Sequence, residues 1–270
     1  MPAPRPPAVI SPRRAVGDLW ALASSQPAPG HGILPVNAYL FRGDSPVLVD
    51  TGLSAERDDF LEKLWSLVPP ARLAAVFLTH EDADHAGNLF AVLEAAPQAR
   101  LVTNYVTVAK LQEAASVPLD RVQVLNPGQR VPGAEGRLTA VRPPVYDAPG
   151  TLGLHDRTTG AVLTVDAFGT YLPEPVEDLR DLAEADVLRG LADFNRMNHP
   201  WAALADQLRF DAAVAAVADL RPTLLLSSHG VVAGDRTDLL LEGLRALPGM
   251  DPYVPPDQPA FEHLKTEMGG

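Results

Sequence analysis

A dense group of metal-ligating side chains lies in one short segment of the chain. Two histidines and three carboxylates fall within six residues, His80-Glu81-Asp82-Ala83-Asp84-His85. Buried together without cations, these groups would be costly to remove from water and their like charges would repel. A solvated loop in which Asp82 or Asp84 caps a helix is the alternative interpretation of this segment taken alone. Imidazole nitrogens and carboxylate oxygens at this density favour a metal site.

Further ligand-type residues follow other apolar strands of the chain. The cluster follows the expected strand Leu73–Leu78, Asp166 follows Ala161–Val165, and His229 follows Thr223–Leu226. In layered α/β proteins, ligands gather at the carboxyl ends of the strands. Each residue alone is better explained as a turn or a capped histidine, but three such strand ends together favour one shared site.

The composition is that of a globular α/β domain. The chain has 270 residues, of which 46% are hydrophobic and 21% charged, and strands alternate with helices along it. The formal net charge of −12 disfavours nucleic acid and anionic membranes as partners. No apolar run reaches the length of a membrane helix. The absence of cysteine excludes disulfides and thiolate metal sites, and it is compatible with the cytoplasmic location that we expect.

The chain is expected to form one main domain. We predict a flexible N-terminal arm over residues 1–14, a layered domain over 15–250 and a C-terminal tail over 251–270. Within the domain, Ser54 is expected to cap a helix with an apolar stripe at Phe60 and Leu64. A helical region from Val176 to Leu220 is expected to break near His199-Pro200.

Five motifs, in this order and spacing, resemble the metallo-β-lactamase superfamily over about residues 15–250. They are Val47–Gly52, His80–His85, Asp147–Thr151, Val165–Gly169 and Ser228–Gly230. The run Asp166-Ala167-Phe168-Gly169 is most similar to the oxygen-binding di-iron branch, which includes the flavodiiron proteins. The resemblance implies a four-layer αβ/βα sandwich of two mixed β-sheets flanked by helices, with a metal pair at one edge.

The resemblance also implies the metal ligands. Asp166 matches the carboxylate that bridges the two metals, and Asp50 matches an aspartate that supports the site without binding metal. The other implied ligands are His80, Asp82 and Asp147 for the first metal and Asp84, His85 and His229 for the second.

Two ligand positions depart from the family pattern. The hydrolases of the family have His at position 82 and the di-iron branch has Glu, whereas both branches usually have His at position 147. Asp82 and Asp147 therefore leave the first site weak or, as the ligand tally slightly favours, oxygen-rich. His155 is a weaker competitor for the role of Asp147. Three imidazoles and four carboxylates suit two iron ions best, with zinc or manganese as alternatives.

Several residues are candidates to line a pocket over the metals, although packing between helix and sheet explains them equally well. They are Phe168, Tyr171, Phe194, Met197, His199 and Trp201.

These features favour a di-iron oxidoreductase that activates dioxygen. We expect a stand-alone monooxygenase that hydroxylates a small organic substrate, with no catalytic residue beyond the metal centre. Its electrons would come from a separate donor, because the 40 residues after Gly230 are too few for a flavodoxin-like domain. The alternatives are a metal-dependent hydrolase of an ester, thioester, lactone or phosphodiester, an oxygen sensor or oxygen reductase, and a metal-poor binding module.

Overall fold

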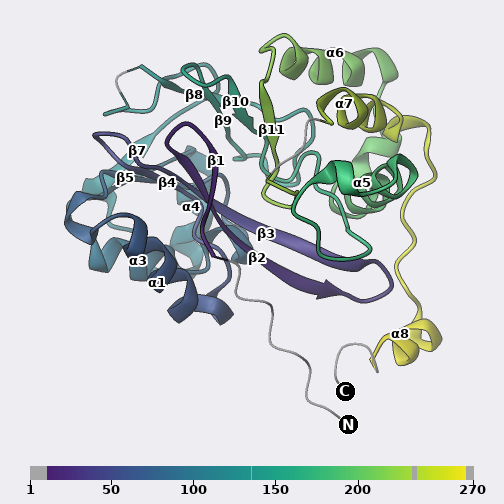
Figure 1. The fold of residues 1–270 in the computed structure, drawn as a ribbon, viewed down its shortest axis with the longest axis horizontal. Coiled ribbons are helices and arrows are strands. Elements are labelled where there is room, and N and C mark those ends of the chain that lie inside the picture. The colour runs from purple at the N-terminus through teal and green to yellow at the C-terminus, as the bar shows by residue number, and fades with distance from the viewer. Residues whose placement is uncertain (1–10, 135, 233–235, 266–270) are drawn as a thin grey trace.

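Two β-sheets lie face to face, and helices cover their outer faces (Figure 1). The structure is a computed structural model that describes residues 11–134, 136–232 and 236–265. The four layers, helix, sheet, sheet and helix, are those of the expected αβ/βα sandwich, and both sheets are mixed.

The first sheet has seven strands in chain order from β1 to β7. The pairs from β1 to β4 are antiparallel, and those from β4 to β7 are parallel. The strands are β1 (Arg13–Val16), β2 (Leu19–Ala28), β3 (Gly32–Phe41), β4 (Val47–Val49), β5 (Ala75–Phe77), β6 (Arg100–Thr103) and β7 (Val122–Val124). Because β4 and β5 are parallel neighbours, the segments that follow them leave the sheet at the same edge.

The second sheet has four strands in the order β11-β10-β9-β8. Its central pair β10 and β11 is parallel, whereas β8, β9 and β10 pair in antiparallel fashion. The strands are β8 (Leu138–Val141), β9 (Gly153–Asp156), β10 (Ala161–Leu163) and β11 (Leu224–Leu226). The segments after β10 and β11 therefore also leave the sheet together.

Three apolar cores separate the four layers. Tyr39, Phe77 and Leu163 belong to the core between the sheets, Leu64 to the core under the first helical layer, and Leu191 to the core under the second. The helices are α1 (Arg57–Leu67), α2 (Ala83–Ala86), α3 (Leu89–Ala95), α4 (Tyr105–Ala114), α5 (Glu184–Asn198), α6 (Gln207–Ala218), α7 (Thr237–Arg245) and α8 (Gln258–Leu264). No helix in these described ranges is long and apolar enough to cross a membrane.

The expected cap at Ser54 is wrong. A short 3-10 turn, Ser54–Glu56, precedes α1, and no side-chain hydrogen bond caps either element. Ser54 is the first residue of this turn, three residues before α1 begins at Arg57, so it is not at the N-cap position of either element.

An ion cluster joins the two sheets. The guanidinium of Arg137, just before β8, donates to both carboxylate oxygens of Asp18 and to both of Asp156, at 2.6–2.8 Å. Asp18 lies in the β1–β2 turn and Asp156 in β9. The Arg137 hydrogen bond is the largest influence on Asp18, whose pKa is lowered. In Asp156, burial opposes the charge, but the hydrogen bonds from Arg137 and Thr159 outweigh it and lower the pKa.

The predicted terminal segments coincide only partly with described residues. Residues 1–10 of the expected arm and 266–270 of the expected tail lie outside the described part. Arg13 and Arg14, which were assigned to the arm, belong to β1, and the tail region contains α8. In Figure 1, α8 stands apart from the sandwich.

Close contact at Gly190 positions α5 against the chain that follows Asp166. A Cβ atom on Gly190 would lie 1.9 Å from the carbonyl oxygen of Tyr171, and the Tyr171 N–H donates to the Gly190 carbonyl. The main chain of α5 at Gly190 therefore packs directly against the main chain at Tyr171. This contact is important for the site, because α5 carries Phe194 and ends at His199.

We predict that Gly190→Ala destabilises the protein by about 1–3 kcal/mol, because overpacking against a backbone oxygen forces α5 to move. The free energy of unfolding, measured by urea denaturation, checks this. Gly249→Ala is the matched control, because no atom lies within 4 Å of its Cβ position, and we expect no loss of stability there. Equal stability of the two variants would contradict the close contact at Gly190.

Candidate metal centre

Four strand ends from two sheets converge at one edge of the sandwich. Asp50 directly follows β4, and the segment from Leu78 to His80 follows β5. On the facing sheet, Asp166 lies three residues after β10 and His229 three residues after β11. The segments that follow these four strands lie together at this edge, as expected for strand ends that share one site.

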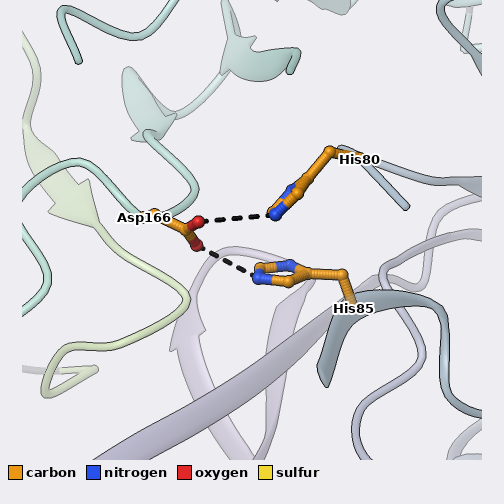
Figure 2. A group of neighbouring side chains, drawn as sticks. All are labelled: His80, His85 and Asp166. Carbon is orange, nitrogen blue, oxygen red and sulfur yellow. Dashed lines mark ion pairs between the residues drawn. The ribbon is translucent and has the colours of Figure 1, made fainter. Parts of the chain in front are cut away.

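The carboxylate of Asp166 faces two groups of histidines at once. Its Oδ2 lies 3.4 Å from His80 Nε2, and its Oδ1 lies 3.1 Å from His85 Nε2. Figure 2 shows both imidazoles pointing toward this one carboxylate. The Asp166 side chain is only 3% exposed, so water does not screen these interactions.

On the Oδ2 side, His80 gathers two further carboxylates. Its Nε2 lies 3.7 Å from Asp82 Oδ2 and 3.8 Å from Asp147 Oδ1. One ligand atom from each of these three residues lies within 4.8 Å of the others, which is a spacing that a metal ion can fill. The Asp82 and Asp147 side chains are 51% and 24% exposed, so this half of the site opens to solvent.

On the Oδ1 side, a second group forms around His85 and His229. His229 Nε2 lies 3.2 Å from both Asp84 Oδ2 and Asp166 Oδ1, and His85 Nε2 lies 3.6 Å from Asp84 Oδ2. The ligand atoms of Asp84, His85 and His229 also lie within 4.8 Å of one another. All seven predicted ligands are thus placed around two adjacent positions that share Asp166.

The outer ring nitrogens of the three histidines are fixed by the surrounding protein. His85 Nδ1 donates to Asp50 Oδ2 at 2.8 Å, and His229 Nδ1 donates to the Pro35 carbonyl at 2.8 Å. The Thr79 hydroxyl donates to Asp50, so its oxygen is left to accept from His80 Nδ1 at 3.2 Å. Each Nε2 lone pair is then directed inward, as metal-binding histidines require.

Sequence reasoning gave Thr79 no role, yet Thr79 ties the cluster together. Its N–H and hydroxyl donate to the two oxygens of Asp50, and its hydroxyl oxygen also lies 3.3 Å from His85 Nδ1. The available signal was its place between a buried strand and His80. The role of the Pro35 carbonyl, which holds His229, could not be predicted from the sequence, because every residue type has a main-chain carbonyl.

Within the described ranges, three buried atoms at the centre make close ion-pair contacts but no well-aligned hydrogen bond. They are His80 Nε2, His85 Nε2 and Asp166 Oδ1, which all face the shared space. A buried polar atom left unpaired costs about 1–3 kcal/mol, so native proteins rarely keep several in one place. The donor set and its inward orientation fit a pair of metal ions, which would bind all three atoms.

The pKa values record how strongly the groups interact. Burial disfavours the charge on Asp166, but His85, His80 and His229 outweigh it and hold the Asp166 pKa well below its usual range. Burial likewise opposes protonation of His229, while the adjacent carboxylates of Asp166 and Asp84 raise its pKa to about 9. Burial raises the pKa of Asp147, with Asp166 adding to the effect. Without metal, protons on the imidazoles balance the carboxylates.

Backbone strain is concentrated beside Asp166. Val165 has φ 60° and Phe168 has φ 66°, a left-handed region that β-branched and bulky residues rarely enter. Such strain costs about 1–3 kcal/mol per residue and is kept where the surrounding structure enforces it. The Ser227 hydroxyl and the Ser228 N–H both donate to the Val165 carbonyl, at 2.7 and 2.8 Å.

Asp147, rather than His155, approaches the cluster. His155 lies in β9, where it pairs with Thr139 and Val162 in the sheet register, and burial lowers its pKa. It belongs to none of the ligand groups found among the described residues. Asp147 reaches His80 from the loop between β8 and β9.

The candidate pocket residues fall into three groups. Phe194 packs on His229, with ring centroids 5.0 Å apart, and Tyr171 meets Phe194 at 5.5 Å and Met197 through its hydroxyl at 3.3 Å. Phe168 is buried in the core of the second helical layer. His199 is buried beside the partly exposed Trp201, whose indole N–H donates to the Tyr146 carbonyl.

The arrangement suits chemistry that needs two neighbouring cations. One half holds a single imidazole with carboxylates and opens to solvent, and the other holds two imidazoles under Phe194. If two cations were bound, the shared carboxylate of Asp166 would hold them close enough for a small molecule to contact both.

Comparison with known proteins agrees with this geometry. The family model described as the metallo-beta-lactamase superfamily matches residues 31–214. A diflavin flavoprotein A 1 of Synechocystis is 30% identical over 145 residues, which are 53% of this chain and 25% of that protein. A nitric oxide reductase of Moorella thermoacetica is 26% identical over 140 residues, 52% of this chain and 35% of that protein. The aligned region is thus about a quarter to a third of the length of these relatives.

Solved structures share the fold. The rubredoxin oxygen:oxidoreductase of Desulfovibrio gigas superposes with a TM-score of 0.71 at 17% identity, covering 88% of this chain and 61% of that one. The family match covers more than half of the chain and includes six of the seven predicted ligands. The chain therefore belongs to the metallo-β-lactamase superfamily, and its homologues include flavodiiron proteins.

Proposed function

We propose that this chain is a non-haem di-iron oxidoreductase that acts on dioxygen or nitric oxide with electrons from a separate donor. The observation that carries the proposal is the convergence on one shared space of His80 Nε2, His85 Nε2 and Asp166 Oδ1, three buried atoms without a well-aligned hydrogen bond among the described residues. The names of the Moorella and Desulfovibrio proteins supply the two candidate small molecules.

The donor set favours iron. The four carboxylates balance the charge of two divalent cations, and the three imidazoles add neutral nitrogen ligands. Such oxygen-rich ligation suits iron or manganese, whereas zinc prefers nitrogen-rich tetrahedral sites. Two iron ions, when bound, would supply the electron-transfer chemistry for reducing a small oxygen-containing molecule.

The protein's own residues would orient the metal ligands and cover part of the site. Asp50 and Thr79 orient His80 and His85, and the Pro35 carbonyl orients His229. Phe194 packs over the ring of His229, whereas Asp84 of that half is 28% exposed. The partly exposed Asp82 and Asp147 mark the side from which a small molecule and protons enter.

A monooxygenase that acts on an organic substrate is the second candidate. It is favoured by the aromatic surface next to Asp147, where Tyr146 and Trp201 have ring centroids 5.9 Å apart and Trp201 is 37% exposed. Such a surface suits an organic substrate that stacks at the open half of the site. In that case one oxygen atom would enter the organic molecule instead of ending in water.

The function is tested by loading the protein with ferrous iron without air and supplying a reduced flavin as electron donor. We expect uptake of dioxygen or nitric oxide in excess of the bound iron, with water or nitrous oxide as product. A hydroxylated product in the presence of small aromatic compounds would select the monooxygenase. Colourless zinc protein that cleaves esters, with iron protein that consumes neither gas, would instead identify the hydrolase alternative.

We predict that Asp166→Ala loses both metals, because each oxygen of this carboxylate faces a different half of the site. Iron content after reconstitution and gel filtration measures this directly. Asp211→Ala on α6 is the matched control and should keep the parent's iron content. Retention of two irons by the Asp166 variant would refute the shared carboxylate.

Replacing Asp147 tests metal binding in the two halves of the site separately, because Asp147 belongs to only one of them. Asp147→Ala should leave the Asp84, His85 and His229 group loaded and reduce the iron content by about one ion per chain, since it removes a carboxylate from the first half only. Asp147→His, which restores the usual family residue, should keep both. Unchanged iron content in Asp147→Ala would show that Asp147 is not a ligand.

A further inference from the structure

His199 is a buried histidine that the metal centre does not account for. It lies between α5 and the 3-10 turn Pro200–Leu204, with its N–H bonded to the Asn195 carbonyl and its carbonyl accepting from the Ala202 N–H. The residue is fully buried, yet neither Nδ1 nor Nε2 has a hydrogen-bond partner among the described residues. A neutral imidazole has one donor and one acceptor, so two polar atoms stand unpaired.

Leaving both atoms unpaired would be costly. Replacing the ring with an apolar side chain of similar size would remove this penalty, and α5 already presents Val187 and Leu191 to the core of this layer. A polar residue at such a place needs partners other than the protein atoms that the structure describes.

The surroundings of His199 leave room for partners on two sides, toward the metal centre and in a small cavity. Its ring centroid lies 6.4 Å from that of Trp201, and Phe194, on the last turns of the same helix, packs on the ring of His229 at 5.0 Å, so His199 lies on the side of α5 that adjoins the metal centre. Burial lowers the pKa of His199 to about 4. The neighbouring Trp201 is anchored to the Tyr146 carbonyl, directly before Asp147. His199 also lines a cavity of about 10 Å³ with Arg196, Met250 and Asp251. That volume has room for about one water molecule.

We propose that His199 hydrogen-bonds a small anionic or diatomic ligand held at the metal pair, while a single buried water in the adjoining cavity satisfies its other ring nitrogen. The inference rests on the proposed metal pair, but not on the reaction carried out there. At neutral pH the ring is uncharged, so it offers one N–H and one lone pair and adds no charge to a crowded site. His199 would thus be a binding residue for the ligand and not a ligand of the metal.

Azide is a suitable probe, because it is a small anion that binds metal centres without turnover. In iron-loaded protein its affinity is read from the change in visible absorption. We expect His199→Leu to keep both irons and to bind azide about fivefold more weakly, which is the effect of losing one hydrogen bond of about 1 kcal/mol. His199→Gln, which retains a donor and an acceptor, should stay within about twofold of the parent.

His155→Leu is the matched control, because it makes the same change at a histidine outside the ligand groups, in β9. Its azide affinity should equal that of the parent. If His199→Leu binds azide as tightly as the parent while holding two irons, the inference is overturned. Absence of azide binding in the loaded parent would overturn it as well.

A second measurement keeps the test decisive if His199→Leu does not fold. In zinc-loaded parent protein, the ring N–H proton of His199, identified by its loss in His199→Gln, should shift on addition of azide. An unchanged resonance at saturating azide would contradict the contact. Because zinc protein performs no redox reaction, a positive result here with no gas uptake by iron protein would retain this inference while rejecting the proposed function.

Discussion

The rest of the site depends on the buried carboxylate of Asp166. Its two oxygens face different histidines at 3.1–3.4 Å in a place that water does not reach. Carboxylates and imidazoles tolerate such crowding only when positive charge balances them. In the metal-free state, protons on the histidines supply that charge, which explains why the pKa values of His80, His85 and His229 are all raised. Metal ions would replace those protons at the same lone pairs, so metal binding must release protons.

Each sheet holds its own part of the ligand set through hydrogen bonds beside the strand ends. The Val165 carbonyl accepts from Ser227 and Ser228, and the Thr170 N–H donates to the His229 carbonyl. These bonds tie the segment after β10 to the segment after β11 and so fix the position of Asp166 relative to His229. On the facing sheet, Asp50 and Thr79 do the same for His80 and His85. The strained φ of Val165 is maintained because a relaxed backbone would lose the bonds that join the two segments.

The sequence predicted the parts of this site that follow from local rules. Short apolar runs ending in His80, Asp166 and His229 read as buried strands, and parallel neighbours must leave a sheet at the same edge. Asp147 could not be found that way, because it lies in the loop between β8 and β9, away from a strand end, and only the resemblance marked it. The roles of Thr79 and Pro35 depend on contacts across long sequence distances. His31, which had no predicted role, stacks on Tyr171 because the long β2–β3 hairpin crosses toward α5 (Figure 1).

The two aspartates that depart from the family pattern make the halves of the site unequal. The half with Asp82 and Asp147 has one imidazole and partly exposed carboxylates, whereas the half with His85 and His229 has two buried imidazoles. Imidazole binds borderline ions such as ferrous iron and zinc more selectively than carboxylate does. The buried half should therefore retain its ion more firmly, and the ion in the open half should exchange more readily with solution. Since that half also faces solvent beside Tyr146 and Trp201, the position with the weaker ligands is the one that an incoming molecule meets first.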